Sequence, residues 1–154
     1  MAELKKGTRV PEFSLKDQDN TTVSLSQFEG KKLLVYFYPK ADTPGCTTQA
    51  CSVQEAMPDL ARLGIAAVGI SPDSPDKQKK FAEKYDLHFP LLSDPDHRVA
   101  DAWGAWGEKS MYGKTYEGII RSSFLVDEKG ALVEAWYKVS PKDTVPNALG
   151  ALAG

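Results

Sequence analysis

The sequence predicts an α/β protein in which helices flank a central mixed sheet on both faces. The first observation is the apolar run at residues 33–38, which has the length and composition of a strand buried on both faces. The second is a similar run at residues 65–71, and each run is followed by a segment with helical signals. The third is a late strand pair around a turn at Gly130, which adds antiparallel strands to the sheet.

The elements before the second apolar run have clear local signals. Residues 13–15 and 22–24 are short extended segments on either side of a polar turn, Asp17-Gln18-Asp19-Asn20, and they predict an N-terminal β-hairpin. After residue 38 a loop leads to a helix, for which Thr43 is a good N-cap and Pro44 suits the first position. We expect Pro58 to break or kink this helix and Gly64 to end the segment.

The second half of the chain continues the alternation of strands and helices. Ser74 is expected to cap a helix over residues 75–85 that begins with Pro75. The remaining predicted elements are a short strand at 89–92, a short helix at 96–103, a strand pair at 123–126 and 131–137, and a C-terminal helix at 144–152.

Length and composition limit the kinds of protein this can be. The chain has 154 residues, and we expect one domain over residues 1–154. Its formal net charge is −2 and no basic stripe stands out, so neither nucleic acid nor an anionic membrane is expected as a partner. The apolar runs are too short to cross a bilayer, and no apolar segment follows Lys5 and Lys6, so a cytoplasmic protein is expected.

Cys46 falls where a predicted strand ends and a predicted helix begins. The free N–H groups of a first helical turn and the positive end of the helix dipole both favour a thiolate. Because the thiolate is the nucleophilic form, we interpret Cys46 as a reactive cysteine and not as a small buried hydrophobic residue.

Cys51 follows Cys46 by five positions. In an intact α-helix this spacing gives a rise of about 7.5 Å and a net rotation of about 140°. The two Cα atoms would then be beyond the roughly 7 Å that a disulfide bridges. The pair can form a disulfide only if the helix unwinds locally, and the alternative is that Cys51 is a core residue.

The segment 37–47 resembles the signature of the peroxiredoxin family, with the spacing Pro39-x-x-x-Thr43-x-x-Cys46. A second cysteine five residues later resembles the bacterioferritin comigratory protein subfamily, also called peroxiredoxin Q. Further segments similar to that subfamily are residues 69–73, 89–94, 112–114 and 120–127. The chain from Ser140 onward is less typical.

This resemblance implies a thioredoxin-like fold and a thiol peroxidase that reduces hydrogen peroxide and organic hydroperoxides. Cys46 would be the peroxidatic cysteine and Cys51 the resolving cysteine, with an intramolecular disulfide that thioredoxin or a similar dithiol reduces. Arg121 would stabilise the thiolate and the departing oxygen, Thr43 would contact the peroxide, and Pro39 would shield the sulfur. This role requires a cation beside the sulfur and an opening to solvent. The resemblance also implies a monomer and no metal, flavin or haem.

Alternatives remain open from the residues themselves. A thiol-disulfide oxidoreductase or redox sensor would share the fold, but no Cys-x-x-Cys is present, and a holdase could use surface that unwinding exposes. His88 and His97 with the two cysteines form a poor zinc set, because the spacing of the cysteines on a helix does not suit chelation. Four aromatic residues precede Arg121, and core packing is favoured over an active-site wall or a partner surface for them. They are Trp103, Trp106, Tyr112 and Tyr116.

Overall fold

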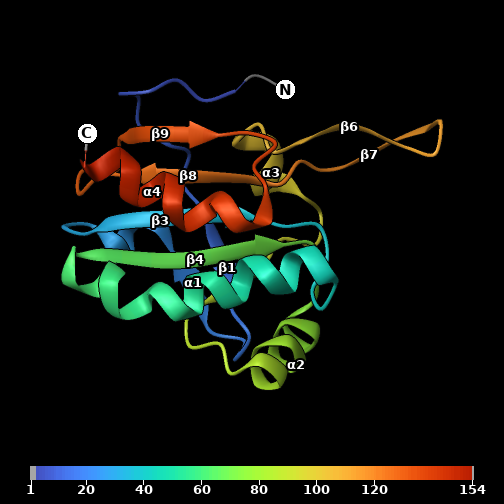
Figure 1. Cartoon of the computed structure of the whole chain (residues 1–154), viewed down its shortest axis with the longest axis horizontal. Coiled ribbons are helices and arrows are strands. Elements are labelled where there is room, and N and C mark those ends of the chain that lie inside the picture. The colour runs from blue at the N-terminus through green and yellow to red at the C-terminus, as the bar shows by residue number, and fades with distance from the viewer. Residues whose placement is uncertain (1–2, 154) are drawn as a thin grey trace.

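The computed structural model describes residues 3–153, and a seven-stranded mixed sheet forms its centre (Figure 1). The strand order is β2-β1-β5-β4-β3-β8-β9, with β3, β4 and β5 parallel and the remaining pairs antiparallel. The strands of this sheet are β1 (Ser14–Lys16), β2 (Thr22–Ser24), β3 (Lys32–Phe37), β4 (Ile65–Ser71), β5 (Leu91–Ser93), β8 (Ser122–Val126) and β9 (Leu132–Trp136). The predicted mixed sheet and the N-terminal hairpin are confirmed.

Helices cover both faces of this sheet, as the sequence predicts. They are α1 (Pro44–Arg62), α2 (Pro75–Tyr85), α3 (Arg98–Ala102) and α4 (Thr144–Ala153), with 3₁₀ turns at Leu25–Phe28 and Pro141–Asp143. Side chains of α1, α2 and α4 pack in one hydrophobic cluster, and α3 belongs to the cluster on the opposite face. The 65–71 strand and the 75–85 helix have the predicted bounds. Ser74 caps α2 by accepting a hydrogen bond from the N–H of Lys77.

β3 connects the two layers because its side chains alternate between them. Leu34 and Tyr36 lie in the cluster under α1, whereas Leu33, Val35 and Phe37 lie in the cluster on the α3 side. All five are buried, as the continuous apolar run predicts. β3 therefore ends inside the protein, and the loop that follows it carries the candidate nucleophile to the start of α1.

Several element boundaries differ from the predicted ones by a few residues. The strand predicted at 89–92 is observed as Leu91–Ser93, and the short helix predicted at 96–103 is confined to Arg98–Ala102. His97 has a left-handed backbone, with φ of 48°, so that the helix cannot begin before Arg98. These shifts change neither the order nor the type of the elements.

The expectation that Pro58 breaks the first helix is wrong, because α1 runs without interruption from Pro44 to Arg62. Proline removes one helical N–H donor and crowds the preceding turn. Pro58 is exposed, so its ring meets solvent and not a packed neighbour, and only four helical residues follow it. The local disturbance is therefore tolerated. The last turn is also held against the sheet by buried Leu60.

A two-stranded hairpin that the sequence analysis does not predict lies between α3 and Arg121. It consists of β6 (Trp106–Met111) and β7 (Lys114–Ile119), and it projects from the body of the protein (Figure 1). Tyr112 and Gly113 both have positive φ, which suits a tight two-residue hairpin turn. Its strands are rich in charged residues and lack the alternation of a half-buried strand, so the pattern was missed.

The aromatic residues before Arg121 do not share one role. Trp103 is fully buried, as core packing predicts. Tyr112 is 97% exposed and Tyr116 is 43% exposed, so core packing is wrong for both tyrosines. Trp106 is half-buried and stacks on His97, with ring centroids 3.7 Å apart. The tyrosines lie on the projecting hairpin, where no layer of the protein covers them.

Among residues 3–153, no helix combines the length and the apolar character that crossing a bilayer requires.

Candidate active site

Cys46 lies in the first turn of α1, as the sequence predicts. Thr43 precedes the helix in an extended conformation and Pro44 is its first residue. The N–H groups of a first helical turn have no carbonyl partner within the helix, so they can stabilise negative charge near the helix start. The local sequence therefore places a thiol at the positive end of a 19-residue helix.

Arg121 contacts the sulfur of Cys46. Its Nη2 lies 3.4 Å from Sγ, although the two residues are 75 positions apart. The register of β3 and β8 produces this contact, because Phe37 lies opposite Ser122 and Arg121 therefore reaches the end of β3. A guanidinium at this distance stabilises a thiolate by charge and by hydrogen bonding.

Gln49 holds the other side of the guanidinium and was missed by the sequence analysis. Nη1 of Arg121 donates to Oε1 of Gln49 at 2.7 Å, and Nε2 of Gln49 donates to the hydroxyl of Thr144 at 2.8 Å. Gln49 and Thr144 are both fully buried. The signal that could have found Gln49 is its position three residues after Cys46, which places a polar residue on the buried face of α1.

Gly45 leaves the space that the guanidinium occupies. A Cβ atom at this residue would lie 3.1 Å from Nη2 of Arg121 and 3.5 Å from Cγ of Pro141. Cys46 itself has an exposed fraction of 0%. The expected cation is therefore present, but the expected opening of the sulfur to solvent is wrong for this structure. Arg121 and Pro141 lie beside the first turn of α1 at this point, so the sulfur can meet a substrate only after some local rearrangement.

Thr43 and Pro39 lie in the loop before α1. Thr43 is the N-cap residue by position, but its hydroxyl donates to the carbonyl of Lys40 at 2.8 Å and does not cap the helix. The predicted side-chain cap is therefore wrong, because the hydroxyl turns back toward the loop. Pro39 is half-buried and follows the end of β3 by two residues.

Cys51 lies in the second turn of α1 and is half-buried, and both cysteines are free thiols. Burial, and then the negative charge of Glu55, raise the pKa of the Cys51 thiol above its usual value of 9.0. The two cysteines thus differ in surroundings, since Cys46 is packed among buried residues with a cation and Cys51 lies near a carboxylate.

A second cation, Lys109 of the hairpin, is close enough to Arg121 and Cys46 for their charges to affect its pKa, and local sequence patterns do not indicate it. Burial and the charge of Arg121 lower the pKa of Lys109, and Cys46 acts on it in the opposite direction. Lys109 lies across the strand pair from Tyr116, and its chain passes over Gly118, where a Cβ atom would be 3.3 Å from its Cδ. Because Gly118 has no side chain, Lys109 has room to extend along β7 toward Arg121.

Polar side chains hold the backbone of the loop at residues 38–43, which joins β3 to α1. Asp73 accepts hydrogen bonds from the N–H of Ala41 and from the hydroxyl of Ser71, both at 2.7 Å. Gln78 is fully buried, donates to Ser71 and accepts a hydrogen bond from Tyr38. Ser71 and Asp73, at the junction of β4 and α2, are thus linked to the loop that precedes α1.

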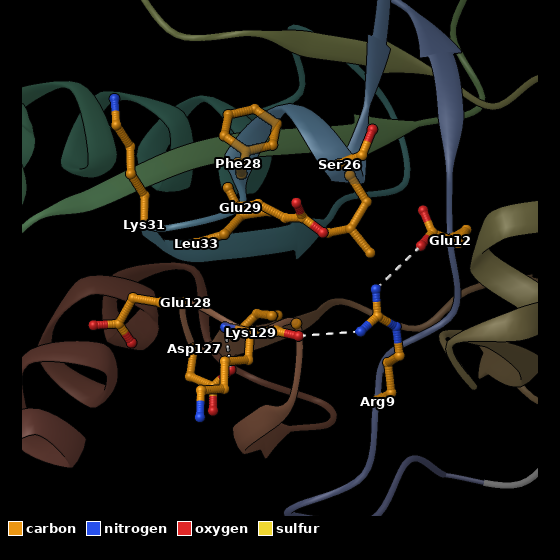
Figure 2. A pocket seen from close by; sticks show the side chains of 13 residues that line it. Arg9, Glu12, Ser26, Phe28, Glu29, Lys31, Leu33, Asp127, Glu128 and Lys129 are labelled. Atoms are coloured by element: carbon orange, nitrogen blue, oxygen red, sulfur yellow. Dashed lines mark hydrogen bonds and ion pairs between the residues drawn. The ribbon is translucent and has the colours of Figure 1, made fainter.

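The cleft in Figure 2 is separate from this site. It encloses about 20 Å³ and lies beside Lys31 and Leu33 at the start of β3, whereas Cys46 follows the end of that strand. Arg9 crosses it and donates to the carbonyl of Lys129, while also pairing with Glu12. Its volume has room for about one water molecule, which does not suit an organic substrate.

A reactive thiol at the start of a helix, after the central strand of a mixed sheet and against an arginine, defines a thioredoxin-like thiol redox protein. The profile of the AhpC/TSA family matches residues 6–135. The chain belongs to this family, and it is a peroxiredoxin of the bacterioferritin comigratory protein and peroxiredoxin Q group, an oxidoreductase with thiol peroxidase activity.

Individual relatives agree with this assignment. Peroxiredoxin Bcp of Escherichia coli is 54% identical over 132 residues, which cover 86% of this chain and 85% of the relative. A mutant of PrxQ from Xylella fastidiosa has a similar structure, with a TM-score of 0.90 and 30% identity over the whole of both chains. The bacterioferritin comigratory protein of Xanthomonas campestris, studied for its alkyl peroxide reduction activity, has a TM-score of 0.85 and 34% identity over 92% of this chain and 90% of the other.

Proposed function

We propose that Cys46 is the peroxidatic cysteine and that its substrates are hydrogen peroxide and organic hydroperoxides. The observation that carries this proposal is the 3.4 Å contact between Sγ of Cys46 and Nη2 of Arg121 at the start of α1. The alkyl peroxide reduction activity described for the Xanthomonas campestris relative supports organic substrates.

The Cys46 thiolate attacks one peroxide oxygen, so that an S–O bond forms and the O–O bond breaks. The electron pair of the O–O bond leaves on the other oxygen, which takes a proton and departs as water or an alcohol. Arg121 stabilises the negative charge first on sulfur and then on the departing oxygen. The Thr43 hydroxyl has acceptor capacity left for the peroxide hydrogen, and Pro39 shields the sulfur without adding a donor.

Gln49 and Thr144 act as positioning residues in this scheme. Gln49 accepts a hydrogen bond from Nη1 of Arg121 at 2.7 Å, and Thr144 in turn accepts one from Gln49. Nη2 of Arg121 is then left to face Sγ of Cys46. Because one edge of the guanidinium is already held, Arg121 loses less conformational entropy when it binds the transition state than an unrestrained arginine would. Lys109 adds a second positive charge on the hairpin side of the site.

Cys51 is the resolving cysteine of the proposed cycle. Its thiol attacks the sulfenic sulfur of Cys46, which releases water and forms an intramolecular disulfide. The first turns of α1 must unwind for this step, because the helical spacing of the two Cα atoms exceeds the disulfide limit of about 7 Å. Thioredoxin or a similar dithiol then restores both thiols.

The protein in this proposal is a cytoplasmic monomer. A resolving cysteine on the same chain removes the chemical need for a second subunit. Two cysteines in 154 residues do not form a disulfide scaffold, which fits a protein of a reducing compartment.

Stopped-flow tryptophan fluorescence after addition of peroxide tests the proposal, since Trp136 packs on the cluster that contains Cys46. The wild type should react faster than free cysteine by more than the roughly thirty-fold that complete ionisation alone could supply at pH 7. Cys46→Ser should abolish the signal. Cys51→Ser should react once with peroxide and fail to turn over with thioredoxin. A wild-type rate equal to that of free cysteine would contradict the proposal.

A further inference from the structure

A groove with an excess of positive charge lies between α2 and the loop that joins β3 to α1. It encloses about 210 Å³. We call it the lysine groove. Figure 1 shows α2 beside the N-terminal part of α1, where this groove is found. Its charged lining residues are Lys40, Lys77, Lys80, Lys84, Asp42 and Asp73.

The two carboxylates of the groove are already engaged. Asp42 pairs with Nζ of Lys84 at 2.9 Å and accepts from the hydroxyl of Tyr85 at 2.8 Å. Asp73 is occupied by Ser71 and by the N–H of Ala41. The four ammonium groups exceed the two carboxylates, although the whole chain has a net charge of −2.

The remaining three lysines are available to a partner. Lys40, Lys77 and Lys80 are all exposed, and within residues 3–153 none of them forms an ion pair. Lys77, Lys80 and Lys84 have the three- and four-residue spacing that places side chains on one face of a helix. Lys79 lies on another face of α2, beside Asp19.

The groove adjoins the segment in which the proposed disulfide forms. Residues 40–42 line it, and Thr43 and the first turn of α1 follow directly. The pairs Asp42–Lys84 and Asp73–Ala41 fasten this loop to α2 and to the end of β4. A molecule bound in the groove would therefore be next to the first turns of α1.

We propose that the lysine groove receives an acidic surface of the dithiol protein that reduces the Cys46–Cys51 disulfide. This inference rests on the proposed function. The lysine ammonium groups are exposed, so each contact with an isolated small anion is weak. An acidic protein surface instead forms several such contacts at once and is attracted from a distance, which raises the rate of productive encounter.

The reductant would transfer two electrons to the Cys46–Cys51 disulfide in two thiol–disulfide exchange steps. One thiolate of the reductant attacks a sulfur of the Cys46–Cys51 disulfide and forms a mixed disulfide, and the other cysteine of this chain leaves as a thiolate that takes a proton. The second thiol of the reductant then attacks the mixed disulfide. This chain regains two thiols, and the reductant departs as a disulfide.

The double variant Lys77→Glu with Lys80→Glu tests the proposal. The control, Lys31→Glu with Lys79→Glu, changes the charge by the same amount at exposed positions outside the groove. The probes are a thioredoxin with acidic residues around its redox cysteines and the small neutral dithiol dithiothreitol. The groove variant should raise KM for thioredoxin about tenfold at low ionic strength, and added salt should reduce the difference.

The same variant should keep wild-type turnover with dithiothreitol and the wild-type rate of Cys46 oxidation by peroxide. An unchanged KM for thioredoxin would overturn the proposal, and so would an equal rise in the control variant. An equal loss with dithiothreitol would also overturn it, because the lysines would then act on the disulfide itself. Absence of peroxide oxidation in the wild type would instead contradict the proposed function, so the two failures are distinguishable.

Discussion

Gly45 leaves the space in which the guanidinium of Arg121 lies. A methyl group there would be 3.1 Å from Nη2 of Arg121, so the side chain of Arg121 has to move by a few tenths of an ångström. Gly45 is the second residue of α1 and its backbone is not in the left-handed region, so alanine suits the helix, but the displacement of Arg121 opposes this gain.

Gly45→Ala should therefore change the stability of the protein little and make the peroxidase slower. Since a 1 Å misplacement costs about 100-fold in rate, we expect a loss of up to about tenfold in the oxidation of Cys46. Gly150→Ala is the matched control, because Gly150 is also helical and a Cβ atom there would have no heavy atom within 4 Å. Urea unfolding and stopped-flow peroxide kinetics measure the two effects. A rate equal to that of the control would show that Arg121 does not need its present position.

The pH dependence of Cys51 follows from its surroundings. Because burial and Glu55 raise the pKa of its thiol above 9.0, its thiolate is scarcer near neutral pH than that of an unperturbed cysteine, and its reactivity rises as the pH approaches the raised pKa. In a Cys46→Ser background, alkylation of Cys51 by iodoacetamide should have its midpoint at a higher pH than that of an unstructured cysteine peptide measured in parallel. Glu55→Gln removes a negative charge, so the midpoint should move down and alkylation at pH 8 should become faster. Glu83→Gln, on α2, should leave the midpoint unchanged, and a Cys51 midpoint at or below that of the cysteine peptide would contradict the assignment.

At the scale of the elements, α1 connects the catalytic residues to their partners. Gln49 is inside the segment from Cys46 to Cys51, so unwinding that segment also releases its bonds to Arg121 and Thr144. Disulfide formation in the proposed cycle would thus free the guanidinium and loosen the contact between α1 and α4. Reduction would restore both, because the rewound helix buries Gln49 and Ala50 again.

The short helix α3 depends on one buried carboxylate. Asp94 accepts hydrogen bonds from the N–H groups of Val99 and Ala100, at 3.2 and 3.0 Å, and its exposed fraction is 1%. Asp94→Ala leaves both donors without a partner and should lower the free energy of unfolding by about 1–3 kcal/mol. Asp96→Ala is the matched control, since Asp96 is exposed and pairs with exposed Arg98. Urea denaturation measures both, and equal effects would show that Asp94 does not hold α3.

At the scale of the whole molecule, residues 1–154 remain predicted to be one domain, although residues 1, 2 and 154 lie outside the described part of the chain. The two hydrophobic clusters share one sheet, and β3 contributes to both. Separation of the layers would expose both faces of that strand, so we expect them to unfold together.

Leu33→Ala and Leu34→Ala test this expectation, because these neighbours are buried on opposite faces of β3. Each should destabilise the protein by about 2–5 kcal/mol and shift a single urea transition. Tryptophan fluorescence and far-ultraviolet circular dichroism should give coincident curves, since Trp103 is in one cluster and Trp136 packs on the other. A variant that shifted only one probe would show that the layers unfold separately.

The sequence by itself determined the order and type of most elements and the position of Cys46 at the start of a helix. These features depend on local chemistry: the apolar run of β3, the proline at the start of α1 and the serine that caps α2. The exposed β6–β7 hairpin had no such signal, because no core imposes an alternating pattern on its strands.

The family resemblance implied Arg121 beside the sulfur, but only the tertiary structure showed how Gln49 and Thr144 hold it there. The contacts between Arg121 and Cys46 and between Gln49 and Thr144 join residues 75 and 95 positions apart. They exist because the pairing of β3 with β8 brings Arg121 to the end of β3 and because α4 packs against α1. Local sequence patterns carry no information on such distant neighbours, and for the same reason they could not show that the sulfur of Cys46 is covered.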